Sequence, residues 1–296
     1  MELYSECKNG NFEKIKLLFE NLYINLFFCD NYGRNYFHMA CIYGSLEIIK
    51  YLLIKTEYIV NLELLNRFKI TKNHADFLNI KIFINAKIID IINKTDCDEI
   101  TPFILACENN HINIIDYLLN DSRIDINKRD KYGYTALYYA CLNQNYDTIN
   151  ILLKNERIDI NRENKNGCTP FHIICYRGNL NCIKLFLEDP RTITNKINNS
   201  FKTPFHYACL NNNIQCINFL LNHPRIDNDE ITNYYFNQYP EKIEMTKKMV
   251  FLYAISDGKL NKKKKINDII IYFGKNKKYW TVFTKEQYDR IIWVKN

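Results

Sequence analysis

Short apolar stripes separated by polar breaks run along most of this chain of 296 residues. Within residues 111–119 the apolar side chains stand at positions i, i+1, i+4 and i+5, which places them on one face of a helix. The same stripe recurs in two other segments, and the three sets are Ile114, Ile115, Leu118 and Leu119; Ile48, Ile49, Leu52 and Leu53; and Ile217, Leu220 and Leu221. Each stripe predicts a short amphipathic helix.

A second apolar phrase precedes these helices and ends in cysteine, as in Thr101-Pro102-Phe103-Ile104-Leu105-Ala106-Cys107. Threonine at this place can cap a helix, and proline suits the first turn because its missing N–H would be unpaired there. A glycine or asparagine, which favours a left-handed turn, separates the two apolar patterns at Gly44, Asn110, Gly178 and Asn212. The combination predicts pairs of short antiparallel helices.

The phrase-ending cysteines set a period for the chain. They fall at residues 7, 41, 107, 141, 175 and 209, with gaps of 34, 66, 34, 34 and 34 residues. Between the helix pairs, Arg123-Ile124-Asp125-Ile126-Asn127 and the following Asp130-Lys131-Tyr132-Gly133 read as a short extended arm and a turn. A fixed period of this size indicates stacked units that each pack against their neighbours.

This repeat resembles that of the ankyrin family, whose consensus phrase is Thr-Pro-Leu-His-x-Ala in units of about 33 residues. Phrase, period, inter-helix turn and connecting turn agree in four consecutive units from about Asp96 to Asp229. An Arg-Ile-Asp sequence replaces the family's common Gly-Ala-Asp and lengthens the unit to 34 residues. The resemblance implies an all-α ankyrin-repeat solenoid of helix-turn-helix units with short finger turns, with about seven units and an atypical C-terminal region.

The repeat divides the chain into an ankyrin-repeat domain, residues 1–229, and a basic, aromatic-rich C-terminal region, residues 230–296, which could be a degenerate capping repeat. Within residues 58–95 the phrase is lost, although Lys87–Ile92 still reads as a second helix and the 66-residue gap is close to two periods. The predicted units are a truncated cap at 1–29, a unit at 30–57, a degenerate unit at 58–95, and regular units at 96–129, 130–163, 164–197 and 198–229.

Composition supports a folded intracellular protein. Hydrophobic residues make up 47% and charged residues 25% of the chain, which is ordinary for a soluble domain. The 11 cysteines follow no apolar signal segment, and no apolar run is long enough to span a membrane. We therefore expect reduced thiols, a cytoplasmic location and a monomeric protein.

Candidate catalytic and metal-binding patterns have structural explanations. His38, His172 and His206 share one phase of the repeat, but Tyr138 and Ile104 occupy that phase in other units, which a metal site would not tolerate. The in-phase cysteines stand where the family prefers a small residue, and no Cys-x-x-Cys or His-x-x-x-His pair occurs. No phosphate-binding loop or nucleophile elbow is present. We expect no enzyme activity, no cofactor, no metal and no small-molecule substrate.

An arginine recurs just after the second helix of each unit, at Arg123, Arg157, Arg191 and Arg225. A row of guanidinium groups could bind an acidic partner or phosphates. Cations at this place also offset the negative C-terminal end of a helix, which is the interpretation we favour.

The resemblance implies that finger turns and the ends of first helices face a concave binding surface. Residues at these places change from unit to unit, and tyrosine and arginine are typical of interface hot spots. The candidate partner-binding residues are Tyr32, Arg34, Tyr43, Lys131, Tyr132, Tyr134, Tyr176, Arg177, Phe201 and Lys202. They predict a non-catalytic scaffold or adaptor that binds another protein, whose identity the sequence does not specify.

The C-terminal region offers an alternative function. It holds the whole formal excess of +7, and its lysines lie near Tyr279, Trp280 and Trp293. Such a mixture could tether the protein to nucleic acid or make a weak contact with an anionic membrane surface, although a solvated lysine-rich loop would read the same way. The lysines concerned are Lys262, Lys263, Lys264, Lys265, Lys275, Lys277 and Lys278. The region could also recruit a second protein, although it contains no docking box that we recognise.

Overall fold

The computed structural model describes residues 2–21, 28–68, 85–211, 214–221 and 223–226, and none of these residues forms a strand. Residues 85–92 are helical, and the remaining helices are α1 (Glu2–Asn9), α2 (Phe12–Asn21), α3 (Tyr36–Tyr43), α4 (Leu46–Phe68), α6 (Pro102–Glu108), α7 (Ile112–Leu119), α8 (Ala136–Leu142), α9 (Tyr146–Lys154), α10 (Pro170–Arg177), α11 (Leu180–Glu188), α12 (Pro204–Leu210) and α13 (Ile214–Leu221). The described chain is therefore a stack of helix pairs.

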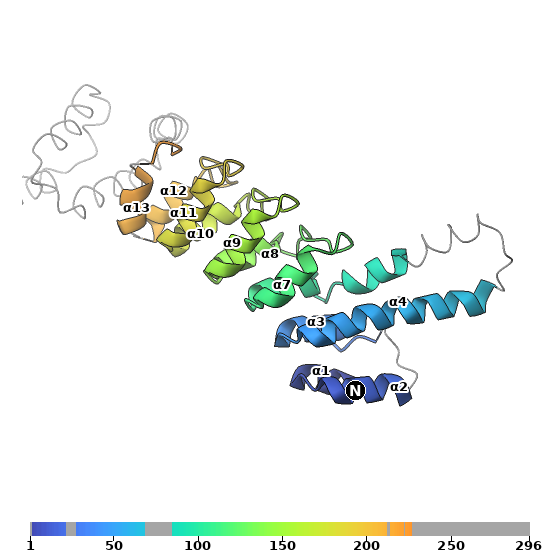
Figure 1. The fold of residues 1–296 in the computed structure, drawn as a ribbon. Coiled ribbons are helices and arrows are strands. Elements are labelled where there is room, and N and C mark those ends of the chain that lie inside the picture. The colour runs from blue at the N-terminus through green and yellow to red at the C-terminus, as the bar shows by residue number, and fades with distance from the viewer. Residues whose placement is uncertain (1, 22–27, 69–84, 212–213, 222, 227–296) are drawn as a thin grey trace, which may run out of the picture.

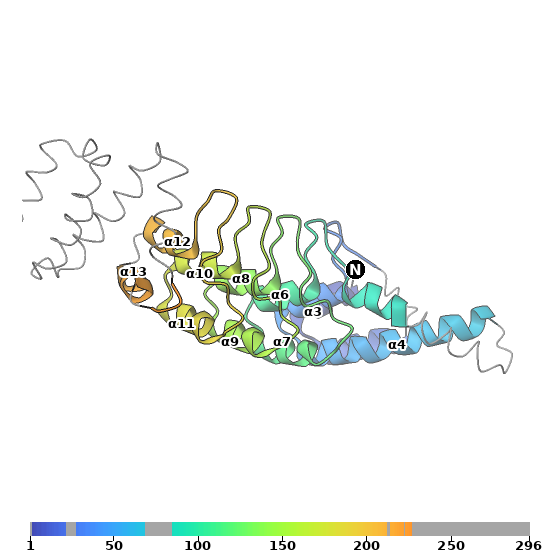
Figure 2. The ribbon, with the colours of Figure 1, turned by 90° about the horizontal axis from the view of Figure 1, so that it is seen from above.

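The helices form two rows (Figures 1 and 2). The first helices of the pairs pack on one another in the order α1, α3, α6, α8, α10 and α12, and we call them the inner row. The second helices α2, α4, α7, α9, α11 and α13 form the outer row. In Figure 2 the loops that join successive pairs project side by side from the inner row. This arrangement confirms the predicted solenoid of helix-turn-helix units.

Capping residues fix where each inner helix begins. Thr101 and Thr135 have extended backbone, and their side chains accept hydrogen bonds from the amides of Ile104 and Tyr138, both at 3.3 Å. These bonds satisfy amides that the first turn of a helix leaves without an intrahelical partner. The predicted capping role of the phrase threonine is confirmed at both positions.

The cysteines that set the period lie at the contact between helices. Cys7, Cys41, Cys107, Cys141 and Cys175 are completely buried, and so are, within one percent, Cys182 and Cys216 of the outer row. Burial raises the pKa of the Cys7 thiol to about 12 and that of Cys141 well above its usual value, which keeps these thiols neutral. They serve as small apolar groups in a close-packed core, as predicted.

The described residues between the second and third helix pairs depart from the regular repeat. Helix α3 packs directly on α6, and no described helix separates them. Helix α4 has 23 residues, whereas α7, α9 and α11 have 8 or 9. The side chain of Asn35, just before α3, donates to the carbonyl of Ile91 at 2.8 Å. Residues 58–68 thus continue α4, and the degenerate unit at 58–95 stays a prediction, because residues 69–84 lie outside the described residues.

Candidate functional site

Five loops, which we call the fingers, share one hydrogen-bonded turn. They are residues 30–34, 96–100, 130–134, 164–168 and 198–202, and each begins with Asp or Asn. A side-chain oxygen of that first residue accepts hydrogen bonds from the amides two and four residues later, at 2.7–3.0 Å. A short acceptor of this kind closes a loop without secondary structure. The finger shape is therefore encoded locally in every unit.

Backbone hydrogen bonds join the fingers edge to edge. The amide of Cys97 donates to the carbonyl of Tyr32 at 2.8 Å. The amides of Lys131, Lys165 and Asn199 donate in the same way to Asp98, Tyr132 and Asn166, each at 3.0 Å. The result is one continuous ribbon of fingers beside the inner helices, visible in Figure 2.

Histidines tie the ribbon to the inner helices. In His38, His172 and His206 the Nδ1 atom accepts a hydrogen bond from the backbone amide of the capping residue, at 3.1–3.2 Å. The proton therefore resides on Nε2, which in His38 and His172 donates to a carbonyl of the next finger, Ile100 or Lys202, at 3.1 Å. Burial lowers the pKa of all three rings to about 4. The structural interpretation of these histidines is confirmed.

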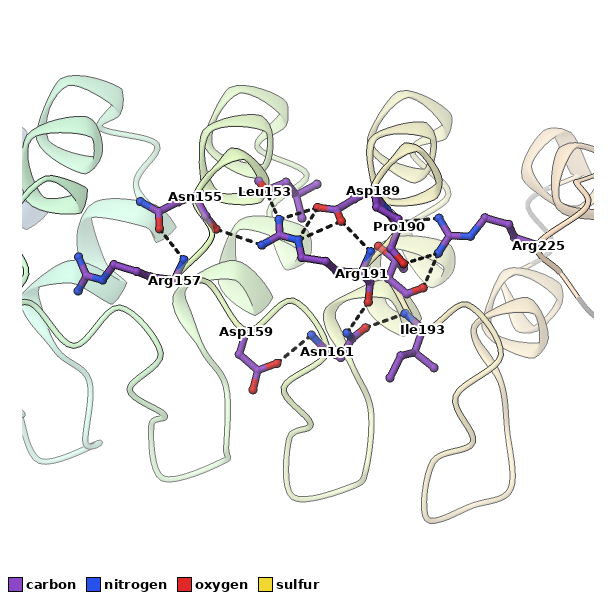
Figure 3. Close-up of polar contacts among 11 residues, drawn as sticks. Leu153, Asn155, Arg157, Asp159, Asn161, Asp189, Pro190, Arg191, Ile193 and Arg225 are labelled. Atoms are coloured by element: carbon purple, nitrogen blue, oxygen red, sulfur yellow. Dashed lines mark hydrogen bonds and ion pairs between the residues drawn. The ribbon is translucent and has the colours of Figure 1, made fainter.

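The arginine column caps outer helices, but across the unit boundary (Figure 3). Arg225 donates to the carbonyls of Leu187 and Asp189 at 2.7 and 2.8 Å, and Arg191 donates to those of Leu153 and Asn155. These carbonyls lie at the C-terminal ends of α11 and α9, where helices leave carbonyls unpaired. Each guanidinium thus fastens its own unit to the preceding one, a geometry that suits its planar set of donors.

Arg123 departs from this pattern for a structural reason. The outer helix before it, α4, continues to Phe68 and so does not end beside this arginine. Arg123 instead pairs with Asp121 of its own unit at 2.7 Å, which lowers the pKa of that carboxyl.

We expect Arg157→Ala to lower the free energy of unfolding by about 1–2 kcal/mol, because it removes donors from several carbonyls at once. Arg157 reaches the carbonyls of Leu119 and Ile124, at 3.2 and 2.8 Å. Arg157→Lys should restore little of this lost stability, since one ammonium group cannot bond to all of these carbonyls at once. Denaturant melts check this, with Arg162→Ala as the control because its pair with Asp159 is long, at 3.8 Å, and exposed. Equal stability of Arg157→Ala and the control would contradict the capping role.

An asparagine column joins the units as well, and sequence reasoning missed it. Asn127 donates from its side chain to the carbonyl of Arg157 at 2.7 Å and accepts from the amide of Asp159 at 2.8 Å. Asn161 makes the same two bonds to Arg191 and Ile193 (Figure 3), and Asn93 makes them to Arg123 and Asp125. The 34-residue spacing of Asn127, Asn161 and Asn195 was the available signal.

Several predicted partner-binding residues are exposed on the ribbon and at the ends of inner helices. Tyr32 and Tyr132, at finger tips, are 61% and 53% exposed. Tyr43, which closes α3, is 42% exposed, and Tyr176 and Arg177, which close α10, are exposed as well. The guanidinium of Arg34 lies 5.4 Å from the centre of the Tyr32 ring, and Lys131 Nζ lies 5.0 Å from that of Tyr132. These cations hold the two rings at the fingertips.

Other predicted residues bind neighbouring parts of the chain. Arg34 pairs with Asp96 at 3.2 Å and Lys131 with Asp98 at 2.5 Å, each linking adjacent fingers. The Tyr134 ring stacks on Tyr138 with 4.3 Å between centres. These three side chains contribute to the rigidity of the ribbon.

The last finger holds the two remaining candidates. Phe201 and Lys202 are partly exposed, and Phe201 has a left-handed backbone, with φ of 57°. The predicted lysine cluster Lys262–Lys265, Lys275, Lys277 and Lys278 lies outside the described residues. Within the described part of the chain, no group of three or more His, Cys, Asp or Glu side chains could hold a metal ion. None of the helices there is both long and apolar enough to cross a membrane.

Comparison with known proteins agrees with this architecture. A search of curated proteins found no match. A family model described as ankyrin repeats in three copies matches residues 3–63, 70–164 and 156–232, which is most of the chain. Repeats of this kind generally mediate protein–protein interaction, and no step of catalysis is typical of them. The chain belongs to the ankyrin repeat family.

Proposed function

We propose that this protein is a non-catalytic scaffold or adaptor that binds another protein through its finger ribbon and the exposed ends of its inner helices. The observation that carries the proposal is the pair of tyrosine rings at the finger tips. Tyr32 and Tyr132 expose 61% and 53% of their surface although they stand on a ribbon held by backbone hydrogen bonds.

Rigid exposed aromatic rings favour binding for two physical reasons. A tyrosine ring supplies a large contact area, and its hydroxyl can bond at the rim of an interface. The finger turn and the neighbouring cation already restrict the ring, so binding a partner costs little additional conformational entropy of this side chain. Arg34 and Lys131 provide the cation beside Tyr32 and Tyr132, respectively.

Removing both rings should weaken partner binding at least about tenfold. We expect the double variant Tyr32→Ala plus Tyr132→Ala to fail to capture proteins that the intact chain captures from extracts of its native cell. The affinity of each purified partner for both proteins is then measured. Tyr146→Ala is the matched control, because Tyr146 is 43% exposed but lies on the outer helix α9. If the double variant and the control bind every partner as tightly as the intact chain, the proposed face is wrong.

The alternative, a tether to nucleic acid or an anionic membrane, depends on residues outside the described part of the chain and stays a prediction. A truncation to residues 1–229 separates the two functions. Loss of binding on truncation, together with a steep fall in affinity as salt rises, would favour the tether.

A further inference from the structure

Charge changes sign along the finger ribbon. The segment 94–100 carries Asp96, Asp98 and Glu99 against Lys94 alone, and Glu108 ends the inner helix of the same unit. In the later segments 128–134, 162–168 and 196–202, lysine and arginine outnumber aspartate and glutamate. Their cations are Lys128, Arg129, Lys131, Arg162, Lys165, Lys196 and Lys202. The second finger of the ribbon is therefore acidic, and the three segments that follow it are basic.

Part of this basic charge is already neutralised within the protein. Lys131 pairs with Asp98 at 2.5 Å, Lys196 with Glu163 at 2.7 Å, and Arg162 with Asp159 at 3.8 Å. Five cations on this side form no ion pair with any carboxylate of the described residues, namely Lys128, Arg129, Lys165, Arg177 and Lys202. Lys165 and Arg177 are exposed, and Lys202 is partly exposed.

Three consecutive units supply the exposed Tyr132 ring and the cations Lys165, Arg177 and Lys202. The amide of Lys165 donates to the carbonyl of Tyr132 at 3.0 Å, so the two residues belong to adjacent fingers. Lys202 lies in the next finger along the ribbon, and its carbonyl accepts from His172 at the start of α10. Arg177 ends that same inner helix. We call Tyr132, Lys165, Arg177 and Lys202 the basic face.

We propose that the basic face binds an acidic segment of the protein partner, with Lys165, Arg177 and Lys202 pairing with its carboxylates and the Tyr132 ring contacting the same segment. This rests on the proposed function and adds the chemistry of the partner to it. Charge complementarity carries the argument: exposed cations without internal partners bind carboxylates, whereas the cations of the internal ion pairs must first release theirs. Arginine can hold a carboxylate in two parallel hydrogen bonds.

A protein segment fits this ribbon better than a nucleic acid does. A nucleic acid is negative along its whole length, so beyond the basic face it would meet the acidic finger with Glu99 and the carboxyl of Glu108. A polypeptide can present carboxylates to the basic face and neutral or basic side chains to the acidic finger. Repulsion between like charges would disfavour any other alignment of the polypeptide along the ribbon.

The test selects ligands from a random peptide library displayed on phage, with the full-length protein as the target. We expect the selected peptides to be rich in aspartate and glutamate. A synthetic copy of the tightest peptide should bind at least about tenfold more weakly to Lys165→Glu plus Arg177→Glu. The control is Lys154→Glu plus Lys184→Glu, which changes the net charge equally on exposed residues of the outer helices α9 and α11 and should leave affinity within about threefold.

Three outcomes would overturn the inference and identify what failed. Selected peptides that lose binding with Tyr132→Ala but are not acidic, and that tolerate the reversal at Lys165 and Arg177, would refute the acidic partner and leave the proposed function standing. Peptides that tolerate all these changes would refute the binding face itself. A single-stranded RNA of about 20 uridines that binds as tightly as the best peptide, and loses binding with the reversal, would make the ligand a nucleic acid.

Discussion

Lowering the pH from 7 to 4 is expected to remove several kcal/mol from the free energy of unfolding, through three buried histidines. The rings of His38, His172 and His206 accept an amide proton at Nδ1, so protonation there breaks the cap of an inner helix. Burial lowers their pKa to about 4, whereas an unfolded chain protonates histidine near pH 6.5. The unfolded state therefore binds the extra protons first.

The sign and the window of this effect follow from the two pKa values. Stability is complete above about pH 6.5, falls as the pH drops through the interval to about 4, and is then steady as far as these rings are concerned. Each histidine should contribute a loss of about 1–3 kcal/mol. The carboxyls of Asp30, Asp121 and Asp189 have lowered pKa values, so their stabilisation is lost at a still lower pH. Urea melts at intervals between pH 7 and pH 4 measure this window, in which Glu108, whose pKa is raised by burial, makes an opposite contribution.

One substitution isolates a single ring. Tyr138 occupies the same place in its own unit, is buried, and accepts a hydrogen bond from Asn164 at 3.1 Å. Asn198 stands at the equivalent place for His172, so we expect His172→Tyr to fold. Its loss of stability between pH 6.5 and pH 4 should be smaller than that of the intact chain by the contribution of one histidine. Identical pH dependence of the two proteins would show that this ring is not the titrating group.

The stacked architecture was predictable because its determinants are local. Each unit contacts only the units before and after it, so the phrase that begins at Thr101 or Thr169 and ends in a buried cysteine recurs wherever the same packing recurs. The finger turn is equally local, since Asp130 or Asn164 bonds to amides two and four residues away. A repeating local pattern fixes a repeating structure.

Spacing alone does not assign residues 58–95. A gap of nearly two periods fits an additional unit and an extended helix pair equally well. Contacts between distant residues add what spacing lacks: Nε2 of His38 donates to the carbonyl of Ile100, and the amide of Cys97 donates to the carbonyl of Tyr32, as between the fingers of neighbouring regular units. The repeat pattern in the sequence does not specify which two fingers are in contact.

Among the candidate site residues, sequence identified the exposed positions but not their partners. The sequence makes Arg34 and Lys131 candidates for binding a partner, yet each pairs with an aspartate of the adjacent finger. Tyr134 has the same spacing as an exposed finger residue but stacks on Tyr138. Whether a finger side chain is free to bind a partner depends on the residues of the adjacent unit, and these cannot be identified from the sequence of one repeat.

Gly133→Ala should lower the free energy of unfolding by about 2–4 kcal/mol. Gly133 has φ of 85°, and a Cβ atom added there would lie 2.8 Å from the amide nitrogen of Lys165 and 3.0 Å from Cα of Asn164. Both are backbone atoms of the next finger, which cannot rotate away as a side chain could. The two fingers would have to separate, at the expense of the 3.0 Å bond from Lys165 to Tyr132.

Gly33→Ala separates this clash from the conformational cost of a left-handed residue. Gly33 holds the same place in its finger with φ of 78°, but its added Cβ would meet nothing closer than 3.4 Å. Glu99 and Phe201, at the same place in other fingers, show that the left-handed backbone accepts a side chain. We therefore expect Gly33→Ala to cost only about 1 kcal/mol in guanidinium melts. Equal losses in the two variants would mean that backbone conformation alone decides the effect, and that the ribbon beneath Tyr132 is not tightly spaced.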